Sequence, residues 1–206
     1  MNSSHQNSTA AAAADARVTR APIAYVGHTV ARPRYYANDH SRDQVPIAAV
    51  EMDIVDARGR RTGLDEAGFT LLPHQSSVAD FTDRAAIEAV HRGEIVDLVK
   101  ALCGADLVLV NSPGVLRFSE KSAKSGALDN SRPARFAHVD ISDATALAFA
   151  QRGAPAGRPL ARFAHFNVWR AISSPPQDVP LAVCDARRLP RRVPSSTPRQ
   201  RTTAGP

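Results

Sequence analysis

Apolar and polar residues alternate along several short stretches of the chain, which is the pattern of half-buried β-strands. The clearest case is residues 45–58, VPIAAVEMDIVDAR. Shorter stretches of the same kind occur at PIAYVGHTV (22–30), GFTLLPH (68–74), ADLVLVN (105–111), RFAHVDIS (135–142), ARFAHFNVWRAI (161–172) and VPLAVCDA (179–186). Strands this short and numerous predict a mainly β fold rather than a doubly wound α/β sheet.

One longer stretch, residues 83–104, has the apolar spacing of a helix. Asp83 is suited to cap its start and Gly104 to end it, whereas Gly93 weakens its middle. A second, shorter helix is predicted over residues 142–153, with Ser142 as its cap. The predicted fold is therefore mainly β (α+β), a jelly roll with one or two flanking helices.

Charge divides the chain unevenly. The net charge of the 206 residues is +6, and the six arginines from Arg187 onward, without any acid, account for all of it. We therefore expect a disordered leader (1–20), a single electrically balanced domain (21–186) and a disordered Arg/Pro tail (187–206). The tail could bind polyanions weakly, but no aromatic platform or reading helix accompanies it, so no specific nucleic-acid partner is expected.

Other features of composition narrow the class of protein. No apolar run reaches the roughly 18 residues of a membrane span, and the N-terminal residues lack the pattern of a signal peptide. The prediction is therefore a cytoplasmic protein without a membrane partner. Cys103 and Cys184 lie among apolar neighbours and form no metal-binding or disulfide pattern, so we expect buried free thiols.

The sharpest chemical feature is His138-x-Asp140 in the predicted strand 135–142. Side chains at i and i+2 of a strand point to the same face, so an imidazole and a carboxylate would converge there. Such a pair is two-thirds of the two-histidine, one-carboxylate triad that binds non-haem Fe(II). The spacing also fits a His and an Asp that only hydrogen-bond locally, and both interpretations stay open on these residues alone.

Four other residues are candidates for ligand or metal contacts. Asn167 and Arg170 lie in NVWR, and an inward-facing Arg170 needs a partner, either Asp178 or Asp185 or a carboxylate-bearing ligand. Arg117 could play a similar role. His165 is either a partly buried histidine with a hydrogen-bond partner or a substitute metal ligand.

Several blocks occur together in one order: VDARGRRTGLDEAGFTLLPHQSSVADF, EIVDLVKALCGADLVLVNSPGVLRF, RPARFAHVDIS and FNVWRAISSPPQDVPLAVCDAR. This set resembles the cephem-methoxylase-related oxidoreductases and the fungal hydroxylase/desaturase proteins of secondary-metabolite clusters, over about residues 45–187. The resemblance implies a double-stranded β-helix, the cofactors Fe(II) and 2-oxoglutarate, and a small-molecule substrate that is hydroxylated or desaturated. It also implies that His138 and Asp140 are the first two iron ligands.

The chain departs from this family after CDAR (184–187). Family members continue to a distal histidine and to an arginine for 2-oxoglutarate, whereas no histidine follows His165 here, and Ala171 stands where the family tends to have proline. We therefore expect an incomplete, C-terminally truncated jelly roll. The alternative to an active oxygenase is an inactive homologue that lacks the third iron ligand.

Overall fold

The structure is a computed structural model that describes residues 17–28, 32–36, 39–128 and 130–189. The chain divides into two compact units. One contains the segments 55–73 and 181–189, and the other contains the segments 18–54 and 74–180. Most of the predicted leader and tail lies outside the described residues, although the first strand already begins at Val18.

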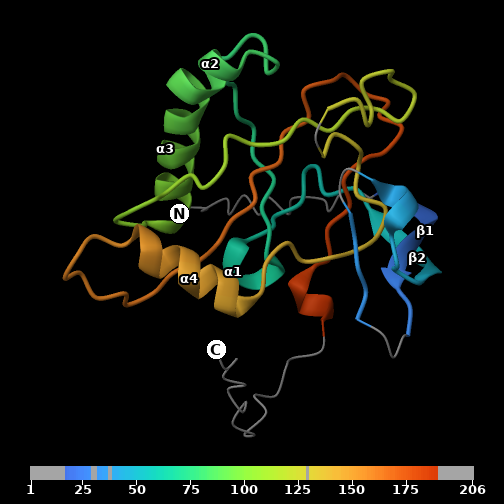
Figure 1. The fold of residues 1–206 in the computed structure, drawn as a ribbon, viewed down its shortest axis with the longest axis horizontal. Coiled ribbons are helices and arrows are strands. Elements are labelled where there is room, and N and C mark those ends of the chain that lie inside the picture. The colour runs from blue at the N-terminus through green and yellow to red at the C-terminus, as the bar shows by residue number, and fades with distance from the viewer. Residues whose placement is uncertain (1–16, 29–31, 37–38, 129, 190–206) are drawn as a thin grey trace, which may run out of the picture. The chain divides into compact units, whose positions relative to one another are not determined.

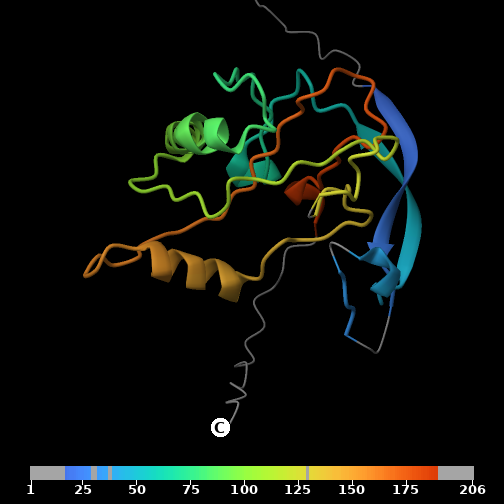
Figure 2. The same cartoon turned by 45° about the horizontal axis from the view of Figure 1, so that its top comes forward.

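The larger unit contains the one sheet found in the described part of the chain, formed by β1 (Val18–Val26) and β2 (Ile47–Val55). The strands are antiparallel, because Gly27 N donates to Pro46 O at one end and Asp56 N donates to Arg17 O at the other. Figures 1 and 2 show the pair as a curved two-stranded ribbon. The strand predicted over residues 45–58 is thus confirmed, whereas the one predicted over residues 22–30 begins earlier, at Val18, and ends at Val26, and residues 29 and 30 lie outside the described residues.

The predicted long helix is confirmed as a continuous run of α2 (Arg84–Ala86), η2 (Ile87–His91) and α3 (Arg92–Cys103) (Figure 1). The segment η2 is a turn of π-helix, which is rare inside α-helices. The Asp83 carboxylate caps the start by accepting from the amides of residues 85 and 86. Gly104 ends the run in the left-handed conformation, with a φ of 63°.

The second predicted helix is α4 (Asp143–Gly153). It begins where Ser142 Oγ accepts a hydrogen bond from the amide of Thr145, as its sequence predicts. Because Ser142 is two residues after Asp140, this cap fixes the point at which the motif segment ends.

The smaller unit contains α1 (Leu64–Ala67) and η3 (Ala186–Arg188), which pack against each other. Ala67 is fully buried, and the Cβ of Ala186 lies close to Gly68. Two carboxylates each pair with an arginine two residues later, Asp56 with Arg58 and Asp185 with Arg187. These pairs hold the pKa of both carboxyl groups down at about 2, chiefly through the arginine side-chain hydrogen bonds.

Five predicted strands do not form in the described residues: 68–74, 105–111, 135–142, 161–172 and 179–186. Their backbones find no ladder partner, and they leave large apolar side chains such as Leu109, Trp169 and Val183 about half exposed. Within the described residues the buried apolar side chains are Ala67 in the smaller unit and Val78, Ile87 and Val99 in the larger one. The jelly roll therefore stays a prediction.

Two further observations concern cysteines and membranes. Cys103 and Cys184 are free but exposed, so the expectation that they are buried was wrong. Their apolar neighbours belong to segments that are themselves exposed, and so do not cover the thiols.

Among the described residues, no helix has the length and hydrophobicity needed to cross a membrane.

Candidate functional site

The motif segment is fixed to the edge of the sheet by its backbone. Ala137 N donates to Ala24 O of β1 across 2.8 Å. One residue earlier, the ring of Phe136 packs edge-on against Tyr35, with 5.4 Å between the ring centroids. These two contacts place His138 beside β1 without a regular strand at 135–142.

The side chains of His138 and Asp140 meet as their spacing predicts. Nε2 of His138 lies 3.1 Å from Oδ1 of Asp140, while its Nδ1 lies 2.8 Å from the carbonyl oxygen of Phe136. A carbonyl oxygen only accepts hydrogen bonds, so Nδ1 carries a proton and donates this bond, and Nε2 is the ring nitrogen that faces the carboxylate. The predicted convergence is confirmed, although local backbone contacts produce it rather than a strand.

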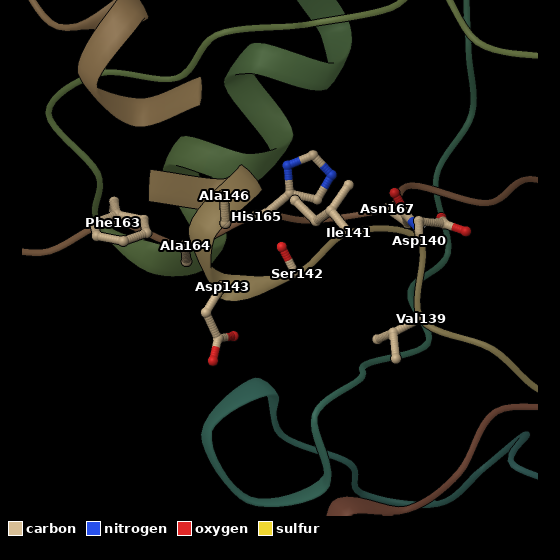
Figure 3. Close-up of a pocket in the computed structure, with 10 residues that line it drawn as sticks. All are labelled: Val139, Asp140, Ile141, Ser142, Asp143, Ala146, Phe163, Ala164, His165 and Asn167. Atoms are coloured by element: carbon tan, nitrogen blue, oxygen red, sulfur yellow. The ribbon is translucent and has the colours of Figure 1, made fainter. Parts of the chain in front are cut away.

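Asn167 contacts the other oxygen of the same carboxylate. Its Nδ2 donates a hydrogen bond to Oδ2 of Asp140 from a segment 27 residues further along the chain. The two side chains lie together in Figure 3. His138 therefore approaches one oxygen and Asn167 the other, which restricts rotation of a carboxylate whose side chain is 49% exposed. Asn167 had been expected to contact a cofactor or substrate; the structure places it on Asp140.

Beside Asp140 is a pocket of about 430 Å³, which Asn167 and His165 also line. Figure 3 shows Phe163 at the other end of this pocket and Ser142 and Asp143 between. His165 packs near Phe149, with 6.1 Å between the rings. Within the described ranges, no three His, Cys, Asp or Glu residues come together closely enough to hold a metal, so His165 does not complete a triad there.

Arg170 is bound to His74, a residue that the sequence analysis did not single out. Its Nη1 donates to the His74 carbonyl oxygen at 2.9 Å, and its Nη2 lies 2.6 Å from Nδ1 of the His74 ring. The expected partners Asp178 and Asp185 were wrong. Asp178 instead accepts from Ser119 Oγ, and Asp185 pairs with its neighbour Arg187.

Arg117 likewise donates its hydrogen bonds within its own loop. Its Nη1 donates to the side-chain oxygen of Asn130 at 2.6 Å and to the carbonyl oxygen of Arg132 at 3.0 Å. The guanidinium thus closes the polar loop 117–132. Neither Arg117 nor Arg170 lines the pocket beside Asp140.

A further ionised group, Glu94 in α3, was missed by the sequence analysis. Its carboxylate accepts hydrogen bonds from Ser76 Oγ and from the backbone amide of Ser77, both at 2.6 Å, and from Nδ1 of His91 at 3.0 Å. The Ser76 bond is the largest cause that lowers the pKa of Glu94 to about 2. No local signal in the sequence could have found this contact, because Glu94 lies 18 residues after Ser76.

Comparison with known proteins places the chain in a family. The family described as "Oxidoreductase/YMDC permease-like domain" matches residues 22–202. The chain belongs to this family. The matched range of this chain includes His138, Asp140 and Asn167.

Three curated fungal proteins are similar to this oxidoreductase-family chain. A Fe(II)/2-oxoglutarate-dependent dioxygenase of Aspergillus novofumigatus is 33% identical over 65% of this chain and 50% of its own length. An alpha-ketoglutarate-dependent dioxygenase of Fungal sp. (strain ATCC 74256) is 27% identical over 75% of this chain and 58% of its own length. A hydroxylase/desaturase of Cercospora beticola is 34% identical over 61% of this chain and 43% of its own length.

These relatives confirm the resemblance to fungal hydroxylase/desaturase oxidoreductases. The chain spans about half the length of the curated relatives it matches. No solved structure matches it.

Proposed function

We propose that the protein is an oxidoreductase that uses Fe(II) and 2-oxoglutarate to hydroxylate or desaturate a small organic molecule, with His138 and Asp140 as two of the iron ligands. The observation that carries the proposal is the 3.1 Å approach of His138 Nε2 to Asp140 Oδ1. The names of the curated fungal relatives support the cofactors.

The donor atoms of this pair fit a metal ion. Two ligands about 2.1 Å from a first-row metal and at right angles to each other are about 3.0 Å apart, close to the observed 3.1 Å. Metal-bound histidines usually donate their second ring N–H to a carbonyl or carboxylate, and His138 does so to Phe136 O. The same contact would be an ion pair if the ring were protonated, so the metal must be tested directly.

In the proposed site, the residues of this chain would bind and orient the metal ion. His138 and Asp140 supply one nitrogen and one oxygen donor, and the Phe136 carbonyl fixes which ring nitrogen faces the site. Bound Fe(II) with 2-oxoglutarate would supply the oxidising chemistry, as cofactors do in general. The pocket beside Asp140, with Phe163 and Ala164 in its lining, is where a small, partly apolar substrate would lie.

The double-stranded β-helix is proposed as the fold of the enzyme. Its support is the set of predicted strands that leave Leu109, Trp169 and Val183 exposed, because such side chains require covering by paired strands or another layer. We also propose a cytoplasmic location, for which two exposed free thiols are the support.

The alternative is a homologue that does not turn over substrate. It is favoured by one observation, that the described residues supply no third metal ligand to His138 and Asp140. Succinate formation from 2-oxoglutarate in the presence of Fe(II), ascorbate and oxygen separates the two possibilities. Iron-dependent succinate formation that His138→Ala abolishes supports the oxygenase. Its absence, in protein that still binds iron, supports the inactive homologue.

A further inference from the structure

We propose that Asn167 and Arg170 act together as positioning residues for Asp140, with Arg170 acting only through Asn167. This inference rests on the proposed metal site, and it assigns to the NVWR segment a role in holding a ligand rather than in contacting a cofactor. The two residues and their contacts are called the Asn167–Arg170 support below.

The first step is the contact between Asn167 and Asp140. A carboxylate turns easily about its terminal torsion, which has broad, two-fold preferences. Here the amide of Asn167 donates to Oδ2, so Oδ1 is left facing Nε2 of His138. Without that amide, the half-exposed carboxylate could rotate or bind water. Outer partners of this kind typically contribute about 10- to 100-fold in metal affinity.

The second step is the attachment of Arg170. Asn167 and Arg170 are three residues apart, so at full extension their Cα atoms are separated by no more than about 10 Å. Arg170 is held at three points: the His74 carbonyl oxygen, the His74 ring and the face of Phe81, 5.7 Å from the ring centroid. Fixing one end of so short a segment limits where the amide of Asn167 can lie.

The third step is that His74 is itself held. Two residues later, the hydroxyl of Ser76 and then the amide of Ser77 donate to Glu94, which is in the first turn of α3. Hydrogen bonds to an ionised acceptor are shorter and stronger than neutral ones. The Asn167–Arg170 support therefore ends on a helix, the most regular element near the site, rather than on another loop.

The guanidinium geometry explains why arginine stands at position 170. Two donors of one planar group reach the carbonyl oxygen and the ring nitrogen of the same residue, His74. Lysine, with a single ammonium on a flexible stem, does not present such a fork. Arg170→Lys thus keeps the charge and removes the double contact.

The experiment titrates the full chain with Co²⁺, a spectroscopic substitute for Fe(II), and follows both the affinity and the ligand-field absorption. The variants are Asn167→Leu, Arg170→Lys and the double variant. The controls are the same substitutions at exposed positions of the same unit, Asn111→Leu and Arg158→Lys. Circular dichroism checks that every variant is folded; if Arg170→Lys is not, His74→Ala replaces it, since it removes the ring acceptor alone.

We expect Asn167→Leu to weaken Co²⁺ binding about 10- to 100-fold and to alter the absorption, and Arg170→Lys to weaken it about 10-fold, at the lower end of that range. The double variant should bind no more weakly than Asn167→Leu alone, because Arg170 acts through Asn167. Controls should match the unsubstituted protein.

Two results would overturn the inference alone: unchanged affinity in Asn167→Leu, or additive losses in the double variant. Failure of the unsubstituted chain to bind Co²⁺ would overturn the proposed metal site, and the inference with it.

Discussion

The carboxylate of Glu94 accepts a hydrogen bond of 2.6 Å from the hydroxyl of Ser76, 18 residues earlier in the chain. This bond joins the first turn of α3 to the loop that follows Pro73. The backbone amide of Ser77 adds a second bond of the same length. A long helix and an irregular loop are thus connected through one ionised side chain.

The first prediction concerns the pH dependence of stability. Glu94 has a folded-state pKa of about 2, below its ordinary value of 4.5. Its ionised form therefore stabilises the folded protein fully above about pH 4.5, and this stabilisation is lost as the pH falls towards 2. Glu94→Gln should lower the melting temperature at neutral pH and should flatten its decline between pH 4.5 and pH 2.

The control for this prediction is Glu88→Gln, six residues earlier in the same helical run, where Glu88 pairs with Arg92 at the surface. Surface pairs contribute little, so this variant should keep the decline of the unsubstituted protein. An equal decline in all three proteins would show that Glu94 is not held in its ionised form by the serines.

The second prediction concerns two glycines whose replacement by alanine should change the free energy of unfolding in opposite directions. Gly104 has a φ of +63°, and a Cβ there would meet open space, so only backbone conformation opposes a side chain. Gly104→Ala should cost about 1 kcal/mol of unfolding free energy. Gly93 lies inside α3, also with open space around its Cβ, and Gly93→Ala should stabilise the protein by about 0.5–1 kcal/mol. Urea unfolding of both variants measures the difference; effects of the same sign would contradict it.

The third prediction concerns the cap of α4. Ser142 Oγ accepts from the amide of Thr145 at 3.2 Å. Ser142→Ala should therefore cost about 1 kcal/mol, and Ser142→Asn should restore most of it because asparagine also caps helices. Hydrogen exchange of the first amides of α4 is the measurement. Equal protection in the alanine and asparagine variants would show that the serine does not hold the helix start.

The helices could be predicted from the sequence because their signals are local. Apolar spacing, the Asp83 and Ser142 caps and the left-handed Gly104 all act within a turn or two of the helix, and the structure confirms them. Apolar and polar alternation also predicted strands at the positions of β1 and β2, but their pairing with each other is shown only by the structure. Residues 105–111 and 161–172 were predicted as strands but do not form strands in the described residues. A strand requires a neighbouring strand to pair with, and the sequence of the segment alone does not specify one.

The site shows the same division. His138 and Asp140 meet as predicted, but the prediction rested on a strand over residues 135–142 that does not form. The partners of Asn167 and Arg170 are 27 and 96 residues away and could not be read from spacing. The resemblance placed these two residues in the block FNVWRAISSPPQDVPLAVCDAR. The structure shows that Asn167 of this block contacts Asp140.

The fourth prediction is the central one, that His138 and Asp140 bind Fe(II). Anaerobic calorimetry of the full chain with Fe(II) should give micromolar or tighter binding to the unsubstituted protein. Asp140→Ala should abolish this binding, while Asp143→Ala, which removes a neighbouring carboxylate of the same pocket, should leave it unchanged. Absence of Fe(II) binding, or equal binding by the Asp140→Ala variant, would contradict the account.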